Sequence, residues 1–266
     1  PRLDIKGVNL VKGIHLEGLR ILGSPSDFAE QYYKNGADEL LLMDVVASLY
    51  DRNGLSELIS EISKNIFIPI TVGGGIRTIK DIKNVLRSGA DKVSINTAAI
   101  KNNEFIKNAI NEFGSSTISI AIECIKGSDG EYYAFTDNGR ESSGLKAIEW
   151  AKEVVQLGVG EIILTSVDKE GTGMGYDNEL LEIFKSISIP LVYHGGIGNL
   201  ENAIDVCKKF DIQAISIASC FHYNLIKKGI INSRINCPKS INSFSLNELI
   251  KNLNYNKILT RKWKKI

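Results

Sequence analysis

The sequence of 266 residues lacks the features that mark several classes of protein. Its net charge is only +1, which gives no reason to expect a nucleic-acid or membrane partner. No apolar run approaches the roughly 18 residues that a membrane-spanning helix needs, and no signal peptide is visible. The four cysteines have neither disulfide nor metal-ligand spacing, so we expect no metal and no cofactor. We expect a cytoplasmic protein in which Cys124 and Cys220 are small buried apolar residues.

An internal repeat is the clearest feature that the sequence does have. Residues 38–98 recur about 122 residues further along the chain. The matching segments are 38–44 with 160–166, 71–76 with 193–197, and 91–97 with 213–219. One offset that links several strand-like segments indicates a duplicated half. The repeat is too long for a solenoid unit and has the right size for half of a (β/α)₈ barrel.

Short apolar runs alternate with amphipathic stretches, a pattern typical of βα units around a parallel sheet. We expect eight strands, near 2–5, 38–44, 67–72, 91–95, 117–122, 161–166, 190–194 and 212–217. We expect helices near 26–34, 55–64, 78–88, 103–113, 145–157, 178–186 and 200–208, with starts at Ser26, Thr78 and Asn199. Longer loops follow the first and fifth strands, at 6–23 and 126–138. The predicted fold class is α/β, a two-fold duplicated (β/α)₈ TIM barrel.

The predicted barrel is a single domain over residues 1–266. Its half-barrels cover about 1–115 and 116–228, and 229–266 form an extension with a loop and a final helix near 246–253. The first residue is Pro1 rather than Met, and strand-like residues begin at once. We therefore expect that a few residues of the first strand precede Pro1.

Two acidic residues, Asp4 and Glu123, end strands at equivalent positions of the two halves. Both carboxylates should lie at the mouth of the same barrel, where a buried acid must be paired or protonated. Two facing carboxylates suit general acid and base catalysis. The structural alternative is that each caps a loop or pairs with a nearby lysine such as Lys6, Lys12 or Lys126.

Glycine clusters form a second symmetric pair. Gly73-Gly74-Gly75 and Gly195-Gly196-Ile197-Gly198 each follow a strand and precede a helix, so their backbone N–H groups can close on an oxyanion. Asn96-Thr97 and Ala218-Ser219 follow the next strand of each half and can complete the cradles. Two cradles predict a substrate with a phosphate at each end. The alternative is that these glycines only make tight turns.

The remaining motifs are less informative. Gly171-Thr-Gly173-Met-Gly175 is a poor match to a dinucleotide loop, because its third glycine comes too early, and a flexible loop over one phosphate is the better interpretation. His194 ends a strand and can face the cavity, whereas we expect His222 to pack in a helix and His15 to lie in a loop. No Ser-His-Asp or Cys-His spacing is present. Charged residues at strand starts, Glu39, Lys92 and Glu161, ordinarily form rim salt bridges.

These residues together resemble a family, the cyclase subunit of imidazole glycerol phosphate synthase (the HisF-like barrels). The resemblance covers residues 1 to about 225 in order. It rests on Leu-Asp-Ile…Leu-Val-Lys-Gly (3–13), Asp-Glu-Leu-Leu-Leu-Met-Asp-Val-Val-Ala-Ser (38–48), Val-Gly-Gly-Gly-Ile (72–76), Ala-Asp-Lys-Val-Ser-Ile-Asn-Thr-Ala-Ala (90–99), Gly-Glu-Ile-Ile-Leu-Thr-Ser-Val-Asp (160–168) and Ala-Ser-Cys-Phe-His (218–222).

The resemblance implies a lyase of histidine biosynthesis. Ammonia from a glutaminase partner, docked on the bottom face, passes through the barrel to a bis-phosphorylated ribulosyl aminoimidazole-carboxamide nucleotide. Asp4 matches a catalytic aspartate, and Glu123 takes the place of the second. Site-lining residues are matched by Lys12, Asp44, Asn96, Thr165 and Ser166, and phosphate contacts by Gly75, Thr97, Gly171, Gly196, Ala218 and Ser219. Glu39, Lys92 and Glu161 match three residues of the ammonia gate, with Asp91 beside them; the fourth, an arginine, would precede Pro1.

The chain also departs from the family pattern. Glu123 and Glu170 stand where the family has aspartate, and His194 replaces a small residue. A misplacement near 1 Å can cost on the order of a hundredfold in rate, so the substrate can differ. The alternative is a related barrel that delivers ammonia to amidinate a surface-polysaccharide sugar. A docking barrel without catalysis would not need Asp4, Lys12 or the cradles, and a sugar-phosphate isomerase would not need the charged bottom ring.

Overall fold

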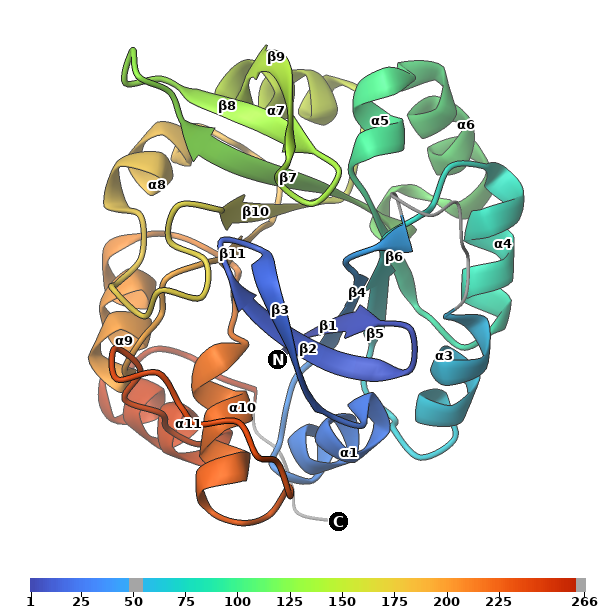
Figure 1. Ribbon diagram of the computed structural model, residues 1–266. Coiled ribbons are helices and arrows are strands. Elements are labelled where there is room, and N and C mark those ends of the chain that lie inside the picture. The colour runs from blue at the N-terminus through green and yellow to red at the C-terminus, as the bar shows by residue number, and fades with distance from the viewer. Residues whose placement is uncertain (48–54, 262–266) are drawn as a thin grey trace.

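A computed structural model describes residues 1–47 and 55–261, and shows one closed barrel surrounded by helices (Figure 1). The eight parallel barrel strands are β1 (Arg2–Lys6), β4 (Leu40–Asp44), β5 (Ile70–Gly73), β6 (Lys92–Ile95), β7 (Ile118–Lys126), β10 (Glu161–Ser166), β11 (Leu191–His194) and β12 (Ala214–Ser216). They pair in chain order from β1 to β12. The barrel closes where Arg2 N–H donates to the Ile217 carbonyl at 3.0 Å. The predicted TIM barrel and its eight strands are confirmed.

The helices lie around the outside of this barrel. They are α1 (Pro25–Lys34), α3 (Ser56–Ser63), α4 (Ile79–Arg87), α5 (Thr97–Lys101), α6 (Asn103–Phe113), α7 (Ala147–Gln156), α8 (Asn178–Phe184), α9 (Leu200–Lys209), α10 (Ser219–Lys227) and α11 (Leu246–Tyr255), with a 3₁₀ turn at Ser115–Thr117. Thr78 and Asn199 cap α4 and α9 as predicted. The prediction that the first helix begins at Ser26 as its cap was wrong: the helix begins one residue earlier, at Pro25, and the N-cap is Ser24. Helix α5 was not predicted, and α10 was expected only as a helix that contains His222, without bounds.

The loops predicted after the first and fifth strands are β-hairpins instead. β2 (Asn9–Ile14) and β3 (Glu17–Gly23) form the first, and β8 (Tyr132–Thr136) and β9 (Glu141–Lys146) the second. β2 pairs antiparallel with β1, and β8 pairs antiparallel with the long outer end of β7. The hairpins thus occupy matching places in the two halves. The matching positions of the two hairpins agree with the predicted division into two half-barrels, which stays a prediction.

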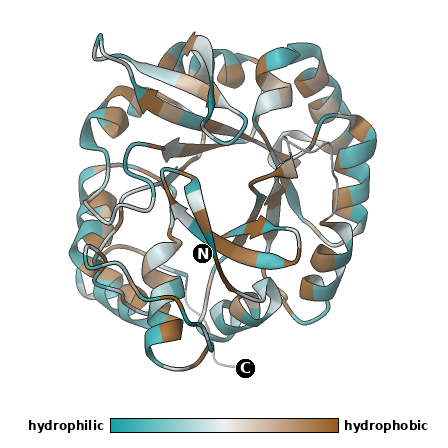
Figure 2. Ribbon diagram, in the orientation of Figure 1, coloured by the Kyte–Doolittle hydropathy of each residue, from teal (hydrophilic) through white to brown (hydrophobic). Residues whose placement is uncertain are grey.

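The side chains of each barrel strand alternate between two environments. On β1, Leu3 and Ile5 are fully buried in the main core between strands and helices, where Figure 2 shows hydrophobic segments on the helix faces that meet the barrel. Arg2 and Asp4 have the opposite parity, so they point into the barrel. A smaller apolar cluster fills part of that interior, and consists of Val11, Leu41, Met43, Val45 and Ile163. The sheet therefore separates an apolar shell from a mixed interior.

Two predicted features lie partly outside the described residues. The end of the motif at residue 48 and the basic residues 262–265 belong to segments that the structure does not describe. In the described part, α11 confirms the helix predicted in the extension, and residues 232–243 form an irregular segment as predicted. Within the same ranges, no helix is long and apolar enough to cross a membrane. Cys124 and Cys220 are buried and unpaired, as expected.

Candidate active site

The two acidic residues expected to be catalytic both lie in the barrel interior. Asp4 is paired in register with Met43 on the neighbouring strand, and Glu123 with Thr165. Asp4 is 2% exposed and Glu123 is 4% exposed. Each sits near the carboxyl end of the barrel part of its strand, the end at which barrel enzymes assemble their active sites. Their surroundings differ sharply.

Asp4 is surrounded by cations. Arg2 Nε donates to Asp4 Oδ1 at 2.7 Å, and Lys12 Nζ lies 3.8 Å from Oδ2. Burial by itself would raise the pKa of this carboxyl group, but the charges of Arg2 and Lys12 outweigh burial and lower it. Asp4 is therefore a carboxylate at neutral pH. The structural alternative considered for Asp4, an ion pair with Lys12, is therefore observed, and Asp4 also lies in the barrel interior as a catalytic role requires.

Glu123 instead has a neutral partner. Asn96 Nδ2 donates to Glu123 Oε2 at 3.0 Å, and the same amide donates to the Phe135 carbonyl at 3.1 Å. Desolvation by burial raises the pKa of Glu123 to about 7, although the charge of Arg2 and a backbone N–H of Gly139 act in the opposite direction. A carboxyl group with such a pKa can both donate and accept a proton near neutrality.

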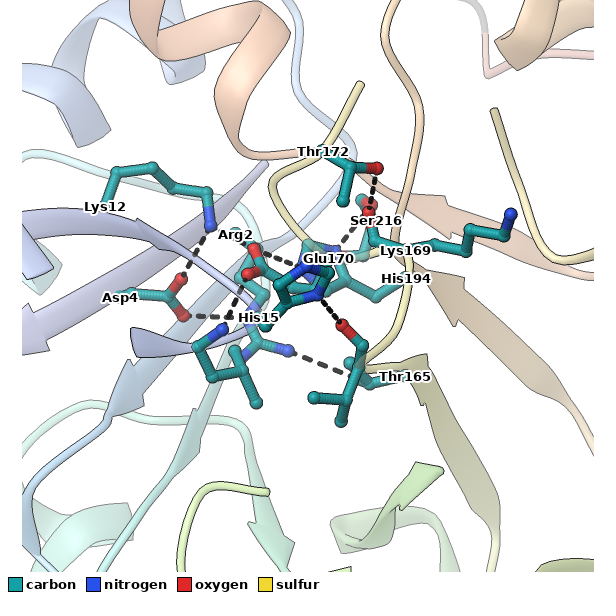
Figure 3. A network of polar contacts seen from close by, with 12 residues as sticks. Arg2, Asp4, Lys12, His15, Thr165, Lys169, Glu170, Thr172, His194 and Ser216 are labelled. Carbon is teal, nitrogen blue, oxygen red and sulfur yellow. Dashed lines mark hydrogen bonds and ion pairs between the residues drawn. The ribbon is translucent and has the colours of Figure 1, made fainter. Parts of the chain in front are cut away.

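A buried polar network joins the first hairpin to the second half of the barrel (Figure 3). Lys12 Nζ, on β2, forms an ion pair with Glu170 Oε1, in the loop after β10. The other carboxylate oxygen of Glu170 accepts from Leu16 N at 3.0 Å. The charge of Lys12 overcomes the desolvation of Glu170, so the pKa of this carboxyl group is lowered and it is ionised. The network thus holds the tip of the β2–β3 hairpin against the barrel mouth.

His194 faces this network, as the sequence allowed. Its Nδ1 lies 2.9 Å from the Ser216 carbonyl and donates to it, while Nε2 lies 3.7 Å from Glu170 Oε1. Burial and the charge of Arg2 lower the pKa of the ring. His222 is buried beside Tyr32 in a helix-packing contact, and His15 lies at the hairpin tip, both as predicted.

The first glycine cradle opens onto a cavity of about 270 Å³. The cavity reaches from the cradle to Glu123, and its polar lining comprises Asp44, Gly74, Gly75, Arg77, Asn96, Thr97, Lys101, Asn102, Glu123 and Asn138. Asp44 Oδ1 accepts from the backbone N–H groups of Val46 and Ala47, at 3.0 and 2.9 Å. The Thr97 hydroxyl accepts from Asp137 N at 3.1 Å. The structure therefore brings together Gly74, Gly75, Asn96 and Thr97 at this cavity, whereas Gly73 of the predicted cluster does not line it.

The cations that line this cavity, Arg77 and Lys101, were missed by sequence reasoning. Arg77 follows Gly75 by two residues, and its Nη2 donates to the Ala47 carbonyl at 3.0 Å. Lys101 ends the short helix that Thr97 begins. A signal in the sequence could have identified them, because Arg77 follows the predicted anion contact Gly75, and Lys101 follows Thr97, by no more than about one helical turn. Their charges favour an anion in the cavity.

The second cradle is much tighter, with a cavity of about 20 Å³. Its lining includes the predicted residues Gly171, Gly196, Ala218 and Ser219 and also Glu170 and His194. Gly196 has φ +80°, and a Cβ there would lie 2.0 Å from the Gly175 carbonyl oxygen, so only glycine fits. Ser166 does not line this cavity: its backbone lies beside Gly195, but its hydroxyl donates to the buried Asp177 at 2.8 Å. Thr165 instead accepts from Arg2 Nη1 at 3.3 Å.

Charged residues meet at the opposite, N-terminal face of the barrel. Lys92 Nζ lies 2.9 Å from Glu39 Oε2 and 3.1 Å from Glu161 Oε2. The Ser119 hydroxyl also donates to Glu161, at 2.8 Å. Partial burial would lower the pKa of Lys92, but Glu161 and Glu39 raise it, so the lysine is charged. Asp91 takes no part in these ion pairs; its Oδ2 accepts from Ile70 N at 2.8 Å.

Known proteins match almost the whole barrel. Residues 1–227 match the family described as histidine biosynthesis protein. A protein of Legionella pneumophila named imidazole glycerol phosphate synthase subunit HisF is 52% identical over 201 residues, which cover 75% of this chain and 95% of that protein. Proteins of the same name from Lactococcus lactis subsp. cremoris (strain MG1363) and Bacillus cereus (strain G9842) are 43% and 44% identical, covering 88% and 84% of this chain and 93% and 89% of their own lengths. The chain belongs to the histidine biosynthesis protein family, with HisF subunits as its relatives.

Proposed function

We propose that this chain is the cyclase subunit of imidazole glycerol phosphate synthase. It uses ammonia to convert a bis-phosphorylated ribulosyl aminoimidazole-carboxamide nucleotide into imidazole glycerol phosphate and an aminoimidazole-carboxamide ribonucleotide. The observation that supports this most directly is the presence of two buried acids, Asp4 and Glu123, inside a barrel that also carries two glycine cradles. The lyase chemistry needs proton donors and acceptors at the reacting atoms, and the cradles set where the ends of the substrate lie.

The proton chemistry belongs to the interior acids. Glu123 faces the larger cavity and has a pKa of about 7, so it can protonate an oxygen that leaves the substrate and accept a proton later. Asp4 is ionised and can stabilise positive charge that develops on nitrogen. Both carboxyl groups are buried, and burial strengthens both interactions, because charges act over a lower local dielectric.

The glutaminase partner docks on the N-terminal face in this proposal, and ammonia enters between Glu39, Lys92 and Glu161. Turnover measured with glutamine and turnover measured with ammonium salt distinguish the entry of ammonia from the chemical step. Lys92→Met should reduce turnover with glutamine and the partner, whereas turnover with added ammonium salt should stay close to that of the unmodified chain. An equal loss in both assays would contradict a role for Lys92 in ammonia entry. Arg87→Met, at the exposed end of α4, serves as a charge-matched control.

The activity itself is tested with the purified chain, ammonium salt and the bis-phosphorylated nucleotide, at a pH where free ammonia is present. Formation of imidazole glycerol phosphate supports the proposal. Asp4→Asn should abolish this turnover and leave substrate affinity within a few-fold. If the unmodified chain folds and binds phosphate but yields no product, the proposed activity is contradicted.

A second candidate is amidination of a surface-polysaccharide sugar with ammonia from a glutaminase. It is favoured by the residues that depart from the family pattern, since Glu123, Glu170 and His194 all lie in the site. Glu170 in particular holds the Lys12 ammonium, a group that the resemblance places among substrate contacts. Assays with both acceptors, in parallel, distinguish the two candidates.

A further inference from the structure

Arg2 crosses the barrel interior and was not singled out by the sequence. It is 1% exposed, and its guanidinium contacts Asp4 on its own strand and Thr165 on β10. Strands β1 and β10 are not neighbours, because β12 and β11 stand between them. Figure 3 shows the guanidinium reaching from β1 to Thr165, below the carboxylate of Asp4 and the Lys12–Glu170 pair. The side chain therefore links two sides of the site.

The hydrogen bonds of Arg2 are incomplete. Within the described residues its Nη2 has no hydrogen-bond partner, although the atom is buried. A buried cation with an unsatisfied donor costs free energy, and an apolar residue of similar size is commonly as stable or more stable at such a site. Stability alone is therefore a poor explanation for an arginine in the barrel interior. Its effect on the neighbouring acids is a better one.

The two acids of the site differ in the charge beside them. Both oxygens of Asp4 face cations, Arg2 at 2.7 Å and Lys12 at 3.8 Å. Glu123 has a side-chain amide at 3.0 Å, and in the described part of the chain no lysine, arginine or histidine nitrogen lies within salt-bridge distance of it. The charged groups that face Asp4 are Arg2 on β1, Lys12 on β2, Glu170 after β10 and His194 on β11, and those that face Glu123 are Arg2, Asp4 and Asp137.

We propose that Arg2 is a positioning residue that gives the two acids different tasks: it holds Asp4 as a permanent carboxylate and leaves Glu123 to exchange protons. The inference rests on the proposed use of ammonia by this site. When ammonia adds to a carbonyl carbon, the C–N bond forms, the C=O π pair moves to oxygen and nitrogen becomes positive. Glu123 gives its proton to that oxygen, and the Asp4 carboxylate faces the positive nitrogen. The lowered pKa of Asp4 and the raised pKa of Glu123 agree with this division.

The test is a pH titration followed by carbon-13 NMR, with labelled aspartate and glutamate carboxyl carbons. Asp4→Asn and Glu123→Gln identify the two signals. In the unmodified chain, Asp4 should stay ionised where the exposed aspartates titrate, and Glu123 should titrate near neutrality. Arg2→Met should raise the pKa of Asp4 by about 1 to 3, the range expected for loss of an adjacent arginine. Arg2→Lys should restore part of the difference.

Controls keep each outcome decisive. Lys34→Met removes an exposed cation that pairs with Glu30 on α1, and should move neither signal. If Arg2→Met does not fold, the pKa values of Asp4 and Glu123 in the unmodified chain and in Arg2→Lys still test the inference. An ordinary titration of Asp4 in the unmodified chain, or an unchanged Asp4 in folded Arg2→Met, overturns the inference. These titrations need no substrate, so a failure of the proposed activity, seen as no product from the unmodified chain, is recognised separately.

The same variants give a kinetic readout. With free ammonia held constant, Arg2→Met should move the acidic limb of the kcat/KM profile to higher pH, because Asp4 then gains a proton within the assayed range. A structural role alone would lower the rate at all pH values without moving that limb. A uniform loss would therefore argue against the inference.

Discussion

Lys12 and Glu170 form an ion pair inside the protein, although 158 residues separate them in sequence. Both side chains are almost fully inaccessible to solvent. Because Lys12 belongs to the β2–β3 hairpin and Glu170 to the loop after β10, the pair holds a surface hairpin across the mouth of the barrel. Glu170 also accepts from Leu16 N at the tip of that hairpin. One carboxylate therefore fixes both the lysine and the backbone of the turn.

Glu170→Gln should destabilise the fold, because it removes the nearer carboxylate of the buried Lys12 ammonium and leaves only that of Asp4, at 3.8 Å. Removal of one partner from a buried ion pair typically costs about 3 to 5 kcal/mol. Urea unfolding of the variant and of the unmodified chain measures this difference. Glu30→Gln, which breaks the exposed pair with Lys34, is the matched control and should change stability by no more than about 0.5 kcal/mol. Equal effects of the two changes would show that the buried pair is not held as described.

Glu123 should make stability depend on pH. Its pKa is about 7 in the folded chain, against an ordinary value of 4.5, so between these values the folded state keeps a proton that the unfolded state releases. The stabilisation is complete below pH 4.5 and is lost as pH rises through 7. Its size is on the order of 3 kcal/mol, from about 1.4 kcal/mol for each unit of difference.

Glu123→Gln removes this titration and keeps the shape of the side chain. The difference in unfolding free energy between the variant and the unmodified chain should therefore grow in favour of the variant from pH 4.5 to pH 7. Titrating groups that do not interact with Glu123 contribute equally to both proteins and cancel. A constant difference across that range would mean that Glu123 titrates normally.

Much of the fold could be predicted from the sequence because hydrophobic periodicity reports burial directly. The eight strands and most of the outer helices were found in this way, but the bounds of α5 and α10 were not. The two hairpins were missed for a local reason. Both segments were interpreted as loops, although β2 and β8 contain apolar and aromatic residues. The first turn uses His15 and Leu16 with φ of +53° and +62°, which are not typical turn residues. The second turn, Asp137-Asn138-Gly139, does have turn chemistry, and could have been recognised.

The site was predictable where residues follow barrel strands directly. Asp4, Glu123 and the first cradle were placed by counting from strand ends. Contacts between distant segments were not predictable, and Lys12 with Glu170 is the clearest example. Arg2 was within reach, since it has the same strand parity as Asp4. An arginine in the first position of a buried strand is a signal in itself, because so large a cation inside needs a partner.

The two cradles predict two anion sites of unequal accessibility. Inorganic phosphate should bind first at the larger cavity, near Arg77 and Lys101, and more weakly at the tight cradle of Gly196. Isothermal titration of the unmodified chain measures the number of sites. Ser219→Ala should weaken only the second site, since Ser219 lines the second cradle and not the first, and Thr97→Val should weaken only the first. A single site in the unmodified chain would argue against a bis-phosphorylated substrate.

The substitution Glu123→Asp separates the two candidate functions. If the chain is the histidine-pathway cyclase, the variant should keep or increase turnover of the bis-phosphorylated nucleotide, because it restores the side-chain length that the family uses. The side chain lies in a cavity of about 270 Å³, so the shorter residue does not have to repack a dense core. The aspartate would, however, sit further from Asn96, which now donates to Glu123 at 3.0 Å.

If the glutamate instead serves another acceptor, the nucleotide should remain unprocessed by both proteins while that acceptor loses turnover in the variant. Both are assayed with ammonium salt, so that absence of the partner has no effect, and Glu30→Asp on the exposed face of α1 controls for the shortening itself. Turnover of the nucleotide by the unmodified chain would by itself favour the cyclase.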